Sequence, residues 1–185
     1  FFNNNHKLGA YLAVVGILVG FLAMLTIAQI YIPVVEGKIL EGRPDEAITV
    51  RITYALMGWV GMTGGGIWAV SLYGFSNRKD WAWYWGVGAA SMQILSGFFP
   101  MIPAGSIGMF SPTLFVILIA FALWFGMLWI GGVPANLVIL AFVTGMAYVM
   151  TYIDGVGAIS RYQTVELPFT VGMYAMGQLV SWLAA

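Results

Sequence analysis

Six long stretches of this sequence contain no charged residue. They are 8–32, 52–75, 81–99, 113–131, 135–153 and 167–185, and each holds 19 to 25 residues. A helix needs about 20 mostly apolar residues to cross the roughly 30 Å hydrocarbon layer of a bilayer. The sequence therefore predicts an all-α integral membrane protein, a six-transmembrane-helix bundle with short loops, that forms one transmembrane domain over 1–185.

The charged residues lie entirely outside these stretches. There are seven basic and seven acidic residues, 8% of the 185-residue chain, whereas a soluble domain carries about 25%. A charge at the centre of a bilayer costs at least about 2.5 kcal/mol, which explains the segregation. The composition excludes a soluble enzyme. The formal net charge of +0 gives a nucleic acid nothing to bind, so the lipid bilayer is the first partner that the sequence predicts.

Two features leave the number of spans open between five and seven. The seven prolines stand at the edges of the stretches or in the expected loops, because proline inside a helix removes a backbone hydrogen bond. The stretch 98–111 contains Pro100 and Pro103 between apolar residues. We expect it to be a loop lying against neighbouring helices, and a re-entrant segment is the alternative.

Residue types that carry chemistry in membranes are missing from the expected spans. The chain has no cysteine and one histidine, His6, which precedes the first span. Proton relays and ion-coupled transporters use ionisable side chains inside the bundle, and a haem or metal site needs several ligands. The sequence leaves enzymatic activity undecided and favours its absence. It predicts no catalytic residue, metal or cofactor, and leaves open a bound lipid, quinone or pigment.

Glycines at helical spacing mark one candidate contact surface. Because lipid supplies no hydrophobic drive between helices, small residues three or four apart allow close helix approach. The sequence predicts a helix-packing groove, or one that accepts a partner's helix, at Gly16, Gly20, Gly58, Gly61 and Gly65.

Two sets of side chains suggest other roles. An aromatic cluster follows Arg78, Lys79 and Asp80 directly and is typical of a membrane interface; it consists of Trp81, Trp83, Tyr84 and Trp85. The glutamines Gln29, Gln93 and Gln178 lie inside expected spans. They serve either to fix helix register through hydrogen bonds or to line a polar path for a solute.

The charged loops on one side form the last candidate site. The stretch 36–51 holds three basic and four acidic residues, and 154–166 lies on the same side of the predicted bundle. The simple interpretation is a solvated face. The sharper one is a docking surface for a partner, which mixed charge would orient, formed by Glu36, Glu41, Arg43, Asp45, Asp154 and Arg161.

Lys/Arg counts on the two sides nearly balance. The Arg78–Lys79 pair in a short loop favours termini in the cytoplasm. For function, we expect a non-catalytic accessory or scaffold subunit of a larger membrane complex, of the respiratory, monooxygenase or photosynthetic type, whose partners are other membrane subunits. The alternative is a transporter for small solutes or lipids with an uncharged polar path.

Overall fold

The computed structural model describes residues 5–164, with side chains as far as Ala147 and those of Met150 and Thr151. This part of the chain is all-helical. Its helices are α1 (His6–Leu40), α2 (Pro44–Ser76), α3 (Trp81–Ser106), α4 (Thr113–Ile130) and α5 (Ala135–Thr164). Helices α1 to α4 are long and apolar enough to cross a membrane, which agrees with the prediction of a helical membrane protein, while the apolar part of α5, Ala135–Ala147, is shorter.

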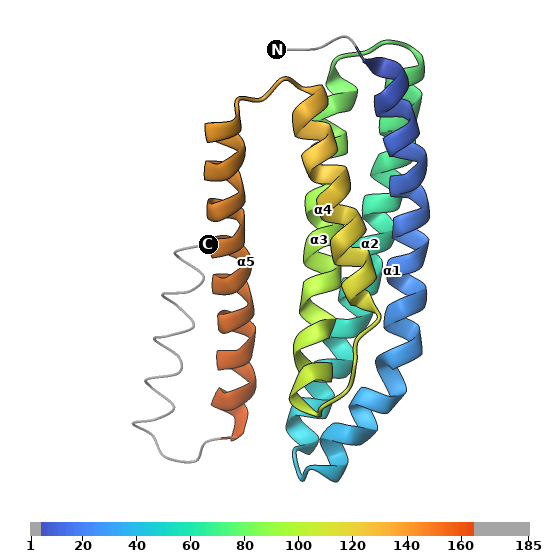
Figure 1. Cartoon of the computed structure of the whole chain (residues 1–185). Coiled ribbons are helices and arrows are strands. Elements are labelled where there is room, and N and C mark those ends of the chain that lie inside the picture. Colours follow the sequence, from blue (N-terminus) through green and yellow to red (C-terminus); the bar gives the residue numbers. More distant parts are fainter. Residues whose placement is uncertain (1–4, 165–185) are drawn as a thin grey trace.

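Successive helices run in opposite directions, and α1 to α4 pack together as one bundle (Figure 1). Helix α5 lies at the side of this bundle next to α4 (Figure 1). Its ring of Phe142 packs on Phe121 and Phe125 of α4, with centroids 5.6 and 5.8 Å apart. The bundle is therefore a four-helix core with a fifth helix attached through aromatic side chains.

The core has two parts because the helices differ in length. At 1.5 Å per residue, α1 is about 52 Å long and α4 about 27 Å. Where all four helices are present, buried alanines surround Trp68 and Met127. Beyond the start of α4, helices α1, α2 and α3 continue around Val34, Tyr54 and Phe99 (Figure 1). This second core supports the α1–α2 turn, and we call residues 36–52 around that turn the hairpin tip.

The prediction that 36–51 forms a loop is wrong. Helix α1 continues through Pro33 to Leu40, and α2 starts at Pro44. A proline inside a helix removes only one hydrogen bond, and Pro44 stands in the first turn of α2, where proline is well tolerated. Gly42, with φ of +76°, makes the turn. The charges of this segment therefore lie on two helix ends and a tight turn.

The prediction that 98–111 forms a loop is also wrong for most of its length. Helix α3 runs through Pro100 and Pro103 to Ser106. Packing in the second core holds it helical, because Phe99, Pro100 and Ala104 are all buried there. Only 107–112 separates α3 from α4.

Two further expectations concern the end of the chain. Helix α5 does not stop at 153 but continues to Thr164, so Asp154 and Arg161 belong to a helix and not, as predicted, to a loop. A helix can carry charges beyond its apolar part wherever it extends past the hydrocarbon layer. The predicted sixth span, 167–185, lies outside the described residues.

Candidate functional site

A hydrogen-bonded side chain lies at the centre of the bundle. Gln93 of α3 is fully buried; its Oε1 accepts from Trp68 Nε1 of α2 at 3.0 Å, and its Nε2 donates to the Gly16 carbonyl of α1 at 2.7 Å. One amide side chain thus joins three helices. The Trp68 ring fits there because Gly16 has no side chain: a Cβ atom on Gly16 would overlap the ring.

Two more bonds between helices lie along α3 towards the hairpin tip. Ser96 Oγ donates to the Met57 carbonyl at 2.7 Å, and Tyr54 OH donates to the Pro100 carbonyl at 2.6 Å. Across the described residues, no buried side-chain nitrogen or oxygen lacks a partner. The polar groups of the interior therefore fix the packing of the helices and leave no unpaired group for a solute or a reaction.

The predicted glycines lie mainly at contacts inside the bundle. A Cβ on Gly20 would be 2.7 Å from the Gly65 Cα, so α1 and α2 meet here backbone to backbone. A Cβ on Gly61 would be 2.6 Å from both Ala23 Cβ of α1 and Ser96 Oγ of α3, and one on Gly58 would be 2.7 Å from a methionine sulfur of α1. These positions are occupied by the protein's own helices.

An open groove runs beside this contact on the outer face of the bundle. Its volume is about 230 Å³, and no charged side chain lines it. Gly66 forms part of its floor, and a Cβ atom there would have no neighbour within 4 Å. The lining residues are Ile17, Gly20 and Phe21 of α1 with Met62, Gly65, Gly66 and Ala69 of α2.

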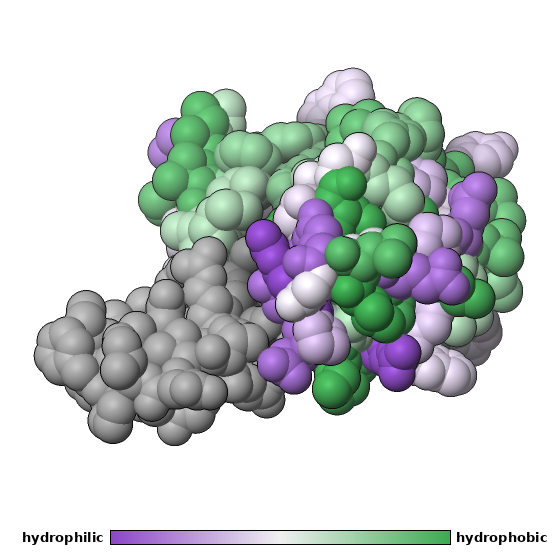
Figure 2. Space-filling model, turned by 90° about the horizontal axis from the view of Figure 1, so that it is seen from below, coloured by the Kyte–Doolittle hydropathy of each residue, from purple (hydrophilic) through white to green (hydrophobic). Residues whose placement is uncertain are grey.

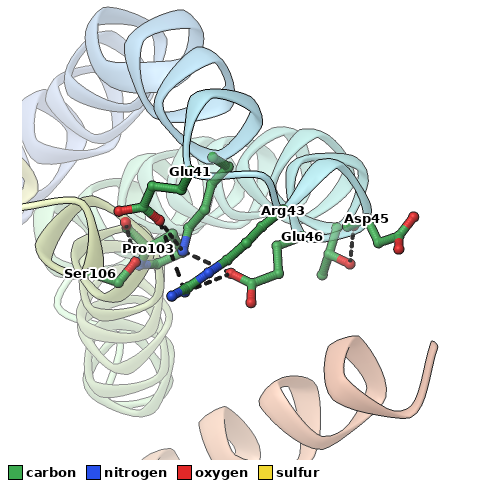
Figure 3. Close-up of polar contacts among 8 residues, drawn as sticks. Glu41, Arg43, Asp45, Glu46, Pro103 and Ser106 are labelled. Carbon is green, nitrogen blue, oxygen red and sulfur yellow. Dashed lines mark hydrogen bonds and ion pairs between the residues drawn. The ribbon is translucent and has the colours of Figure 1, made fainter. Parts of the chain in front are cut away.

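The hairpin tip contains a cluster of ion pairs. Lys38 Nζ donates to Glu46 Oε2 at 2.7 Å and lies 3.8 Å from Glu41 Oε2, although the lysine is only 3% exposed. Arg43 Nη1 lies 3.9 Å from Glu41 and 3.7 Å from Glu46. These groups converge beside the end of α3 near Ser106 (Figure 3). The pairing explains how a lysine can be buried, because its charge is balanced within the cluster.

Apolar side chains lie exposed among these charges. Leu40 is 88% exposed, and Ile39, Ile48 and Ile52 are about half exposed or more. From the end that carries the hairpin tip, hydrophilic residues are seen around a hydrophobic patch (Figure 2). Of the other predicted docking residues, Glu36 and Asp45 are exposed, and Asp45 points away from the cluster (Figure 3). The side chains of Asp154 and Arg161 lie outside the described residues.

The predicted aromatic belt is divided between two directions. Trp81, Tyr84 and Trp85 are exposed on the surface of α3. Trp83 is partly buried and turns to α4, where its Nε1 donates to the Met127 carbonyl at 2.6 Å and its ring covers Gly131. Three rings are thus available at the surface, and the fourth joins two helices.

The glutamines predicted to line a path are not brought together. Gln29 is exposed on α1, whereas Gln93 is enclosed in the bundle, and Gln178 lies outside the described residues. Sequence reasoning missed Lys38, Glu46 and Trp68 as partners in buried polar contacts. The i to i+8 spacing of Lys38 and Glu46 across Gly42-Arg43-Pro44 is the signal that could have found the ion pair.

The described residues contain no group of three or more His, Cys, Asp or Glu side chains that could hold a metal ion. Comparisons with protein-family models, with curated proteins and with solved structures found no match to this chain. Arguments about function therefore rest on the packing of the bundle, the groove and the hairpin tip.

Proposed function

We propose that this protein is a non-catalytic accessory or scaffold subunit of a larger membrane complex, of the respiratory, monooxygenase or photosynthetic type. The observation that carries the proposal is the hairpin tip, where Leu40, Ile39, Ile48 and Ile52 are exposed between charged residues. Lipid tails do not cover side chains that alternate with charges, and water does not stabilise them. A partner protein with an apolar patch and complementary charges would stabilise them.

The interior supports the same proposal. Trp68, Tyr54 and Met127 fill the core, and the polar groups between them are paired with one another or with backbone. A transporter with a polar path would need free polar groups near the middle of the membrane. Since both functional groups of Gln93 are engaged, no observation in the described bundle favours that alternative.

Purification from native membranes in a mild detergent tests the proposal. We expect partner proteins to come down in fixed stoichiometry with the wild-type chain. Replacing Leu40 and Ile48 with alanine should weaken the association at least tenfold, because burying one such side chain contributes about 1.5–3 kcal/mol. The matched control is alanine at Leu18 and Leu25, exposed on the apolar part of α1, which should leave the partners bound. A lone monomer, under conditions that keep other complexes intact, would contradict the proposal.

We further propose six spans with both termini in the cytoplasm, which puts the hairpin tip on the opposite side. Lys7 and the Arg78–Lys79 turn lie at the same end of the bundle (Figure 1), as positively charged cytoplasmic ends would. The chain has no cysteine, so a single cysteine at Asn77 or at Asp45 can report sidedness. We expect an impermeant maleimide added outside intact cells to label Asp45→Cys and not Asn77→Cys, and the reverse pattern would invert the orientation.

A further inference from the structure

The groove between α1 and α2 lies halfway along the apolar parts of both helices. Gly20 is near the centre of the charge-free stretch 8–32, and Gly65 is near the centre of 52–75. Both glycines line the groove. If these stretches span the hydrocarbon layer, the groove opens to lipid tails near the middle of the membrane. An occupant must therefore be apolar.

The size and lining of the groove limit what kind of apolar group fits. About 230 Å³ is less than the roughly 300–1,000 Å³ of pockets that hold ring-bearing ligands. The side chains around it belong to isoleucine, phenylalanine, methionine and alanine and offer no hydrogen bond to a quinone oxygen or a pigment substituent. One hydrocarbon chain fits these conditions better than a ring system does.

The end of the bundle above the groove is basic. Lys7, Arg78 and Lys79 are all exposed, and none of them has an ion pair with another described residue. Asp80 is the only acidic residue beside them in the α2–α3 turn. At the hairpin tip, by contrast, Lys38 and Arg43 are paired with glutamates. The free positive charges of the described bundle therefore gather at this one end.

The distance between the basic end and the groove matches one leaflet. Twelve residues of helix and turn separate Gly66 from Arg78, a rise of about 18 Å at 1.5 Å per residue. Half of the hydrocarbon layer is about 15 Å. Tyr11 of α1 and Tyr73 of α2 are strongly exposed between the two levels, as aromatic side chains near headgroups are.

We propose that this face of the bundle binds an anionic phospholipid, with its headgroup phosphate at Arg78, Lys79 and Lys7 and one acyl chain in the groove at Gly65 and Gly66. Arginine and lysine donate charge-assisted hydrogen bonds to phosphate oxygens. The groove holds the chain because α1 and α2 meet at glycines, which leaves bare backbone where side chains would otherwise project. This site is separate from the hairpin tip and does not depend on the accessory-subunit proposal.

Native mass spectrometry of the detergent-solubilised chain tests the site. The probe is dioleoyl phosphatidylglycerol, compared with dioleoyl phosphatidylcholine, which has the same acyl chains and no net charge. We expect retention of phosphatidylglycerol in preference to phosphatidylcholine by the wild type. Each basic residue near an anionic headgroup contributes roughly fivefold to binding. The variant Arg78→Gln with Lys79→Gln should therefore lower the preference by about 25-fold.

Two further variants separate the groove from the charges. Gly66→Leu fills the groove without a clash, because a Cβ there meets nothing, and should reduce retention of both lipids. Its control is Gly88→Leu on α3, another exposed glycine with an open Cβ position, which should retain them. Arg51→Gln at the other end of the bundle is the charge control and should keep the preference.

Three outcomes would overturn the proposal. One is equal retention of the two lipids by the wild type. The second is unchanged retention in Gly66→Leu, or a loss of equal size in Gly88→Leu. The third is an increase in melting temperature with inorganic phosphate as large as that with phosphatidylglycerol, which would show a phosphate site without an acyl chain.

Discussion

Replacing Gly20 with alanine adds one carbon atom at the place where α1 and α2 meet backbone to backbone. The new Cβ would lie 2.7 Å from Gly65 Cα and 3.0 Å from both Gly65 N and the Gly61 carbonyl oxygen. These three atoms are backbone and cannot rotate away. To restore an ordinary contact of 3.4 Å or more, the two helices must move apart by about 0.7 Å, which loosens the packing on both sides of the contact.

The size of the effect follows from two opposing terms. Overpacking a well-packed contact costs about 1–3 kcal/mol, while alanine is favoured over glycine inside a helix by up to about 1 kcal/mol. Gly88→Ala on α3 receives the second term alone, because its Cβ meets nothing within 4 Å. We expect the free energy of unfolding of Gly20→Ala to fall below that of Gly88→Ala by about 1–3 kcal/mol.

Equilibrium unfolding in mixed detergent and sodium dodecyl sulfate micelles, followed by circular dichroism, measures this difference. Both substitutions make the same chemical change inside a helix, so helix propensity cancels in the comparison. If the two variants unfold with free energies that agree within about 0.5 kcal/mol, then α1 and α2 do not touch at Gly20. The glycine contact would then have no role in holding the bundle together.

The same unfolding assay checks three other contacts. Gln93→Leu should destabilise the bundle by about 2 kcal/mol, since it removes two bonds between helices and leaves a buried donor unpaired; Ser91→Ala, which loses only a bond within α3, should be near neutral. Lys38→Met should cost about 1–2 kcal/mol, less than the 3–5 kcal/mol of a fully buried pair because Glu46 stays 31% exposed, and Glu46→Gln, which keeps an acceptor, should cost less. Tyr54→Phe should cost about 1 kcal/mol by losing the bond to a carbonyl of α3. A variant that matches wild type in any of these cases would show that the contact does not stabilise the protein.

The sequence predicted where helices start better than where they end. Charged or turn residues mark the starts of α3, α4 and α5 within a residue of the charge-free stretches. The ends of α1, α3 and α5 were placed too early, since Glu36, Pro100 and Asp154 were taken as boundaries and all three lie inside helices. Hydrocarbon thickness limits the apolar part of a helix, but it does not limit how far the helix extends into water.

The candidate site could be predicted only in part, for a similar reason. Spacing along one helix identified Gly20 and Gly65, because small residues are needed at any close helix crossing. It could not show that the two meet each other, nor that Gly66 next to them stays open, since this depends on how α1 and α2 are rotated. The burial of Lys38 likewise depends on Glu46 being turned towards it across the hairpin.

The unequal lengths of the helices give the bundle an uneven apolar height. Helix α4 has 18 residues, about 27 Å, whereas the charge-free part of α1 and its continuation to Val35 extend over about 42 Å. Bilayer lipids must thin or tilt to follow such a step, at a cost of fractions of a kcal/mol per Å of mismatch. A step of several Å then costs as much as a single substitution in the core. Membrane thickness is therefore a variable to which this fold responds, and the bundle should be most stable in a bilayer that can vary its thickness around the perimeter of the protein.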